Sequence, residues 1–102
     1  MTYQYRNEYN ETLKSVTIPN GYTSIGDSAF RYCTNITSII IPNSISKIGS
    51  NAFEYCSNLF SITIPTSVSK IEDCTFGHCS NLSSIIIPIS VTEIGDCAFV
   101  HC

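Results

Sequence analysis

The chain has 102 residues, of which 43% are hydrophobic and 13% charged, and its formal net charge is -3. This length fits one domain rather than two. The five basic residues are scattered and form no stripe, so nucleic acid is not an expected partner. The longest apolar runs are three isoleucines followed by a proline, far short of the roughly 20 residues of a spanning helix, so no membrane insertion is expected.

Residues 1–12 are interpreted as an N-terminal leader or cap that precedes the repeats. This segment is polar and has no apolar stretch of the kind found in secretory signals, which favours a cytoplasmic protein. Its tyrosines are expected to cover the first repeat: Tyr3, Tyr5 and Tyr9.

From residue 13 onward the sequence repeats every 23 residues. Prolines at positions 19, 42, 65 and 88 and cysteines at positions 33, 56, 79 and 102 both follow this interval. The four repeats cover residues 13–35, 36–58, 59–81 and 82–102. A unit of this size cannot bury its own apolar side, so the repeats are expected to be the stacked coils of a solenoid.

Each repeat begins with apolar residues at relative positions 1, 4 and 6, such as Ile36, Ile39 and Ile41. This spacing is the L-x-x-L-x-L signature of a leucine-rich repeat. The last two residues alternate as in a strand with one buried face, and the proline that follows ends the strand. The pattern therefore predicts a parallel sheet on one face of the solenoid.

The outer face of this predicted sheet is flat, nearly uncharged and rich in hydroxyl groups. Its apolar positions, together with one threonine among them, are candidate partner-binding residues: Ile40, Phe60, Thr63 and Ile86. The other interpretation is that serine and threonine merely suit a strand that faces solvent.

A second apolar pair follows the proline, as in Ile45 and Ile48, and predicts an extended back wall. Next comes an Asp or Ser, a residue type typical of helix N-caps, before a small residue and a phenylalanine two and three positions later. The pattern predicts a short helical turn in each coil, running to the repeat cysteine, with these caps: Asp27, Ser50, Asp73 and Asp96.

The phenylalanines and the repeat cysteines are each expected to stack in a ladder through the core. One position breaks the repeat, because Glu72 stands where the other coils have Gly26, Gly49 and Gly95. Either this position does not need a positive φ, or the third coil is strained.

The complete unit over residues 36–58 is I-T-S-I-I-I-P-N-S-I-S-K-I-G-S-N-A-F-E-Y-C-S-N. It resembles the BspA-like class of leucine-rich repeats in its I-x-I-P, I-G, A-F and C-S-N elements, and the resemblance extends over residues 13–102. The resemblance implies a right-handed solenoid that binds host proteins, matrix proteins or partner cells. It also implies the cell surface as the alternative location.

The six cysteines are favoured as free thiols, because four of them occupy one repeat position beside the phenylalanine. Stacked cysteines one coil apart also satisfy the Cα separation of a disulfide, so that alternative stays open.

One candidate metal site stands out, a tetrahedral zinc set made of Cys74, His78, Cys97 and His101. The first two repeats have no cysteine or histidine at these positions, which favours a variable surface ring over a metal site. We therefore expect no cofactor.

No motif for catalysis occurs in the sequence. It contains no G-x-S-x-G, no phosphate-binding glycine loop and no isolated carboxylate pair, so we expect a non-enzymatic protein.

Two functions are compatible with this sequence. The first is a protein-protein interaction module that presents the sheet face to a partner. The second is a structural building block that assembles end to end into oligomers or filaments with further copies of itself. The second would use inward-facing residues of the last coil: Leu82, Ile85, Ile87, Ile94 and Phe99.

Overall fold

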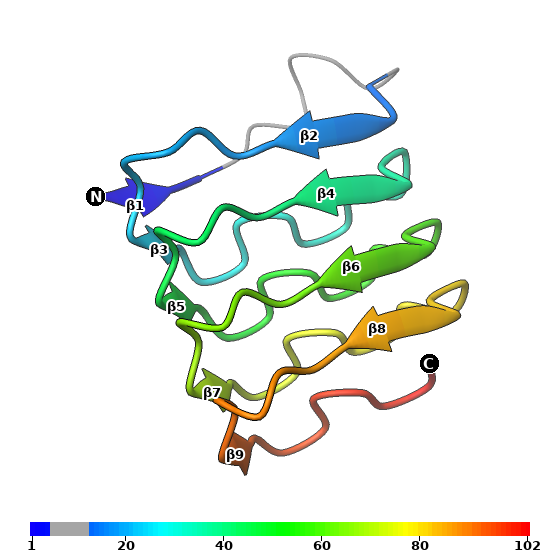
Figure 1. The fold of residues 1–102 in the computed structure, drawn as a ribbon. Helices are drawn as coiled ribbons and strands as arrows, with labels where there is room; N and C mark the ends of the chain where they lie inside the picture. Colours follow the sequence, from blue (N-terminus) through cyan, green and yellow to red (C-terminus); the bar gives the residue numbers. More distant parts are fainter. Residues whose placement is uncertain (5–12) are drawn as a thin grey trace.

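The computed structural model describes residues 1–4 and 13–102, and the predicted roles of Tyr5 and Tyr9 lie outside these residues. The described chain winds through about four coils stacked side by side (Figure 1). One wall is a parallel four-stranded sheet in the order β2-β4-β6-β8. Its strands are β2 (Ser15–Thr17), β4 (Ser38–Ile40), β6 (Ser61–Thr63) and β8 (Ser84–Ile86).

The predicted sheet is confirmed, and its alternation is the one that the sequence implies. Ser15 pairs in register with Ser38, and Thr17 pairs with Ile40. The middle residues of β2, β4 and β6 are buried, whereas the last residue of each strand faces solvent. Because side chains alternate along a strand, one residue per strand enters the core and its two neighbours form the outer face.

The extended back wall is also confirmed. It contains two short parallel sheets, β1-β3-β5 and β7-β9. These strands are β1 (Thr2–Tyr3), β3 (Ser24–Ile25), β5 (Lys47–Ile48), β7 (Lys70–Ile71) and β9 (Glu93–Ile94). Tyr3 from the leader packs edge-on against Tyr22 and in a stack on Phe30, with ring centroids 5.1 and 5.8 Å apart.

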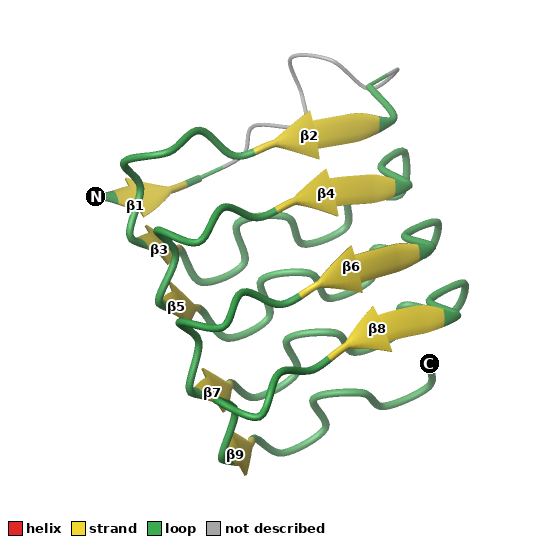
Figure 2. Ribbon diagram, viewed as in Figure 1, coloured by secondary structure: helices red, strands yellow, loops and turns green. Residues whose placement is uncertain are grey.

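The predicted helical turns are wrong, because the described residues contain no helix (Figure 2). Two residues of each coil have a left-handed backbone, such as Ser28 with φ 59° and Tyr32 with φ 63°. A right-handed helix requires negative φ throughout, so these residues interrupt it. The chain instead makes a series of tight turns between the back-wall strand and the repeat cysteine of each coil. These stacked turns are called the turn wall.

Backbone hydrogen bonds explain why this turn wall is preferred to a helix. Phe30 N donates to Ala52 O of the next coil at 2.7 Å, whereas Arg31 N donates to Ser28 O within its own coil at 3.1 Å. The same alternation recurs in the second and third coils. The N–H groups of a helix point along its own axis and not toward the neighbouring coil, so stacking favours the turns.

The aspartates predicted as N-caps also bridge coils. Asp27 Oδ1 accepts from Ser50 N at 3.0 Å, and Asp73 Oδ1 accepts from Asp96 N at 2.8 Å. This contact leaves no room beside it, because a Cβ on Gly49 would lie 2.4 Å from Asp27 Oδ1. Among the described glycines only Gly21 has a positive φ, so the repeat position at which Glu72 replaces glycine does not require a positive φ.

The two predicted ladders run through the core beside the aliphatic residues of the strands, and both are confirmed. Phe30, Phe53, Phe76 and Phe99 stack with centroids 5.2, 5.3 and 5.4 Å apart. The thiols of Cys56, Cys79 and Cys102 each donate to the carbonyl of the phenylalanine in the preceding coil, as Cys79 Sγ does to Phe53 O at 3.1 Å. The part of the chain that the structure describes has no helix long and apolar enough to span a membrane.

Candidate protein-binding face

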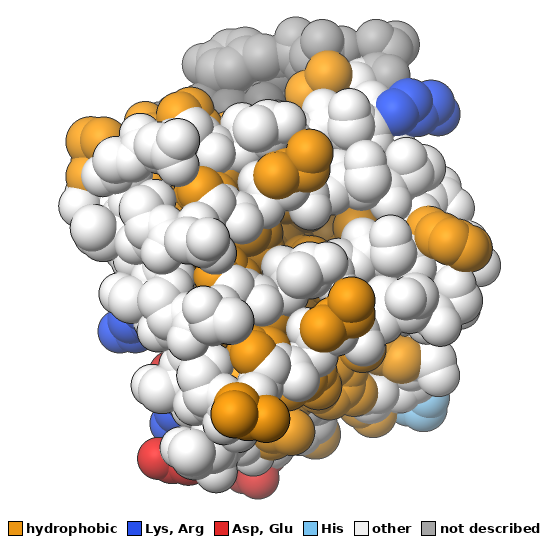
Figure 3. Space-filling view, viewed as in Figure 1, with side chains coloured by type: hydrophobic (Ala, Val, Ile, Leu, Met, Phe, Trp, Pro, Cys, Tyr) orange, Lys and Arg blue, Asp and Glu red, His pale blue; other side chains and the backbone are white. Residues whose placement is uncertain are grey.

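The outer face of the β2-β4-β6-β8 sheet is the surface on which the predicted binding residues lie. The outward residues of its strands are uncharged and alternate between hydroxyl and aliphatic side chains: Ser15, Thr17, Ser38, Ile40, Ser61, Thr63, Ser84 and Ile86. In Figure 3 the apolar side chains on this face form separate patches within a largely polar surface. Such a face has little charge to desolvate when a partner covers it.

Three large apolar side chains on this face are exposed to solvent. The exposed fractions are 62% for Ile40, 60% for Phe60 and 61% for Ile86. Thr63 pairs in register with Ile86, so these two residues lie in one row across the sheet. Phe60 lies directly before β6, outside that row. The structure therefore places all four predicted residues on one face, with Phe60 set apart along the strand direction.

A shallow depression of about 330 Å³ lies between β4 and β6. It is lined by aliphatic side chains and a few hydroxyl groups: Ser38, Ile39, Ile40, Ile41, Ser61, Ile62 and Thr63. The strands β4 and β6 are in register only at Ser38 and Ser61, whereas the flanking pairs are in register over three residues. No feature of the repeat predicts this depression, because all four coils have similar strands.

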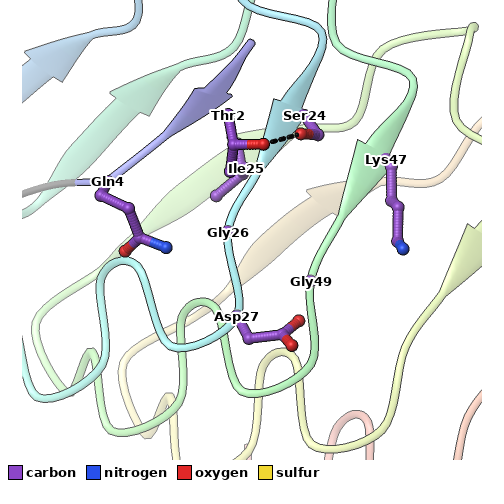
Figure 4. A pocket seen from close by; sticks show the side chains of 8 residues that line it. All are labelled: Thr2, Gln4, Ser24, Ile25, Gly26, Asp27, Lys47 and Gly49. Atoms are coloured by element: carbon purple, nitrogen blue, oxygen red, sulfur yellow. Dashed lines mark hydrogen bonds between the residues drawn. The ribbon is translucent and has the colours of Figure 1, made fainter.

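A second depression, of about 350 Å³, lies beside the back wall (Figure 4). Its lining is polar and glycine-rich: Thr2, Gln4, Ser24, Ile25, Gly26, Asp27, Lys47 and Gly49. Thr2 Oγ1 and Ser24 Oγ are hydrogen-bonded to each other at 2.8 Å, and the Asp27 carboxylate binds Ser50 N. These groups already serve the stacking of the coils, so this depression is the weaker candidate.

The residues predicted for end-to-end contact differ in exposure. Ile94 is 56% exposed and Ile87 is 38% exposed. The other three, Leu82, Ile85 and Phe99, are partly buried against the core. Ile89, which the sequence analysis missed, is fully exposed in the loop after β8. The sequence could have indicated this residue, because isoleucine stands there at a repeat position where the other coils have asparagine or threonine.

The candidate zinc set, which the sequence disfavours, does not converge on one point. The rings of His78 and His101 are stacked with centroids 4.8 Å apart, so their lone pairs run side by side rather than toward a shared ion. Among the described residues no group of three or more His, Cys, Asp or Glu side chains is placed to hold a metal ion.

All six cysteines are free thiols, in agreement with the favoured interpretation. Burial raises the pKa of Cys33 to about 11 and that of Cys79 to about 12, and it raises the pKa of Cys56 further still. These three thiols are protonated at neutral pH and act as small apolar side chains within the core.

The sequence matches the BspA type leucine rich repeat region over residues 3–102, in six copies of the family unit. No curated protein matches the chain. Among solved structures, it is similar to a leucine rich repeat protein of T. pallidum, with 33% identity and a TM-score of 0.83. It is also similar to a leucine-rich repeat protein of Bacteroides ovatus, with 30% identity and a TM-score of 0.77. A leucine rich cell surface protein of Faecalibacterium prausnitzii matches with 32% identity and a TM-score of 0.70.

These likenesses concern nearly all of this chain but only part of each relative. Each alignment covers 88% of the chain, and it covers 42%, 29% and 31% of the three structures in the order given. The chain therefore spans less than half the length of each of these proteins.

Proposed function

Because the chain belongs to the BspA-type leucine-rich repeat family, we propose that it is a protein-interaction module whose binding surface is the outer face of β2, β4, β6 and β8. The observation that carries the proposal is the exposure of Ile40, Phe60 and Ile86 on a face whose strands have no charged outward residue. Leucine-rich repeats are in general scaffolds for protein interaction, and solenoids present such extended surfaces.

The chemistry of the face suits a protein partner. Burying one exposed aliphatic or aromatic side chain contributes about 1.5–3 kcal/mol, and a few such anchors account for most of an interface's binding energy. The serine row of the sheet supplies hydroxyl groups that both donate and accept hydrogen bonds around these anchors. The partner is expected to present an uncharged, partly apolar surface.

The depression between β4 and β6 is the proposed recipient of one apolar side chain of the partner. Its floor is aliphatic, and Ser38 and Ser61 lie at the end where the two strands remain paired. Its volume of about 330 Å³ is at the small end of the range for ligand sites, and no charged residue lines it.

The family relatives also bear on location. One similar structure is described as a leucine rich cell surface protein, which supports the cell surface as the place where this chain acts. The partner would then be a host protein, a matrix protein or a protein of another cell.

Matched aromatic substitutions test the proposed surface. Phe60→Ser removes an exposed ring from the sheet face, and Tyr32→Ser removes a ring of similar exposure, 56%, from the turn wall. Both variants and the unmodified chain are measured by biolayer interferometry against a panel of purified matrix proteins. We expect Phe60→Ser to weaken binding more than about tenfold and Tyr32→Ser to change it little. Equal losses in the two variants would contradict the proposal.

A second candidate function is assembly through the fourth coil. The observation that favours it is that Ile94 is 56% exposed, although the equivalent residues Ile48 and Ile71 are fully buried by their neighbours. Light scattering over a roughly hundredfold range of concentration tests it. A mass that grows with concentration and falls back after Ile94→Asp would support assembly, whereas a constant 11.2 kDa would exclude it.

A further inference from the structure

A pair of thiols lies on the turn wall, apart from the cysteine ladder of the core. Cys74 and Cys97 occupy the same position in the third and fourth coils, with φ 57° and 58°. Cys74 N donates to Asp96 O at 3.0 Å, so a backbone hydrogen bond joins the two coils beside this pair. The two coils are in parallel register just before this pair, where β7 pairs with β9. Paired strands lie about 4.8 Å apart, which is within the roughly 4.4–6.8 Å between Cα atoms that a disulfide requires.

The environment of this pair differs from that of the core cysteines. Cys56 Sγ and Cys79 Sγ donate to backbone carbonyls, and both residues are fully buried. By contrast, Cys97 is exposed and Cys74 is partly exposed. A small oxidant can therefore reach the outer pair, whereas stacked coils cover the inner thiols.

The backbone gives no reason for a thiol at this position. Ser28 and Asn51 hold it in the first two coils, and asparagine is a residue type that tolerates left-handed φ well. Cysteine has no such advantage, yet it appears in both of the adjacent coils where two thiols can meet. Several residue types can adopt the backbone conformation of this turn. The presence of a thiol in both adjacent coils is therefore better explained by a reaction between the two thiols than by the backbone.

We propose that Cys74 and Cys97 form a reversible disulfide that joins the third and fourth coils when a low-molecular-weight disulfide, such as glutathione disulfide, is the oxidant. The Cys97 thiolate attacks one sulfur of the oxidant, forms a mixed disulfide and releases one glutathione, which takes up a proton. The Cys74 thiolate then attacks the Cys97 sulfur and releases the second glutathione. Two cysteines are oxidised, and one glutathione disulfide is reduced to two glutathione molecules.

The surroundings of Cys74 assign it to the second step. Burial, the negative charge of Glu54, the neighbouring Cys97 and the charge of Asp73 all raise the pKa of Cys74. Because the thiolate is the nucleophile, the closing step is faster at higher pH. The bond closes a loop that includes all residues between the two cysteines, so it restricts the unfolded chain and stabilises the last two coils.

The test oxidises the reduced full chain with glutathione disulfide under native conditions and measures its mass after acid quenching. We expect a monomeric product lighter by about 2 Da. Cleavage after Glu72 and Glu93 separates residues 73–93 from 94–102, and fragmentation of the linked peptides identifies the bonded sulfurs. Peptide mapping of the unmodified chain decides the proposal even if a variant fails to fold.

Two single variants provide the comparison. Cys97→Ser is expected to abolish the loss of about 2 Da, whereas Cys102→Ser, also at an exposed cysteine, is expected to retain it. The oxidised chain should melt at least roughly 5 °C above the reduced chain, and Cys97→Ser should show no such difference. A bond mapped to Cys79 and Cys102, a covalent dimer, or two bound glutathiones without any internal bond would each overturn the proposal.

Discussion

The sheet wall and the turn wall hold the same coils together by different backbone conformations. In the sheet wall, extended strands pair in register, as Ile62 does with Ile85. In the turn wall, every second N–H crosses to the next coil while the others close local turns, as Phe53 and Glu54 illustrate. Both walls satisfy the backbone by bonding between coils, so the cross-coil hydrogen bond is the common element of the fold.

The difference between the two walls lies in their side chains. The turn wall sends its phenylalanines and the cysteines Cys33, Cys56 and Cys79 into the core, whereas the outer face of the sheet wall leaves an isoleucine or phenylalanine exposed on three of its coils. Both walls therefore contribute to the core, and the outer face of the sheet wall is left to bind a partner. The predictions below separate these two roles.

The largest effect is expected from Phe53, which is fully buried between two stacked rings. Phe53→Ala should lower the free energy of unfolding by about 3–5 kcal/mol, because it leaves a cavity in the ladder. Phe60→Ala removes the same type of side chain from the sheet face and should change the free energy of unfolding by less than about 0.5 kcal/mol. Urea unfolding of both variants checks the contrast, and similar costs would contradict the division of roles.

A smaller effect is expected where the turn wall is most crowded. Gly49→Ala places a Cβ 2.4 Å from Asp27 Oδ1 and 2.6 Å from Asp27 N, so it should cost about 1–3 kcal/mol. Gly77→Ala is the control, since its Cβ would find no atom closer than 3.4 Å. Thermal melts of the two variants give the comparison. Unchanged stability of Gly49→Ala would show that the coils are spaced more loosely than the contact with Asp27 implies.

Alkaline pH should weaken the turn wall through its buried thiols. Folding raises the pKa of Cys33 to about 11 and of Cys79 to about 12, from an ordinary value of 9.0. The unfolded thiols lose protons first, so this stability is complete below about pH 9 and is lost as the pH rises toward 11 or 12. The urea concentration at the unfolding midpoint should be lower above pH 9 than below it. The decrease should be smaller in Cys79→Ala.

The smallest effect on stability is expected from the sheet face itself. Ile40→Asp and Ile86→Asp alter side chains that are about three-fifths exposed, so each should change the free energy of unfolding by no more than about 0.5 kcal/mol. Circular dichroism melts check this directly. A large loss of stability would mean that these side chains serve the fold, which would remove them as candidates for binding.

Much of this fold follows from the 23-residue period. The alternation around Ile39, the back-wall pair Ile45 and Ile48, and the two ladders are each set by one residue type at one repeated position. Stacking identical coils places identical residues together, so a local pattern becomes a long-range contact. The exposure of Ile40, Phe60 and Ile86 was predictable for the same reason, although their binding role stays a prediction.

The turn wall was not predictable in the same way. Asp27 before Ala29 and Phe30 resembles a helix start, yet its carboxylate bonds the next coil. Local propensity describes the bonds a segment can make with itself, and here the neighbouring coil offers better ones. The depression between β4 and β6 lies where only Ser38 and Ser61 are paired, and the similar strand sequences do not reveal this shorter pairing.

Hydrogen exchange with a bound partner tests the division between the two walls most directly. Once a matrix protein that binds the chain is in hand, amide exchange is measured with and without it. We predict slower exchange in β2, β4, β6 and β8 and in the residue before β6, with little change in the back wall or around the left-handed turns. Protection concentrated on the turn wall or the back wall, with the sheet unchanged, would contradict the proposed binding face.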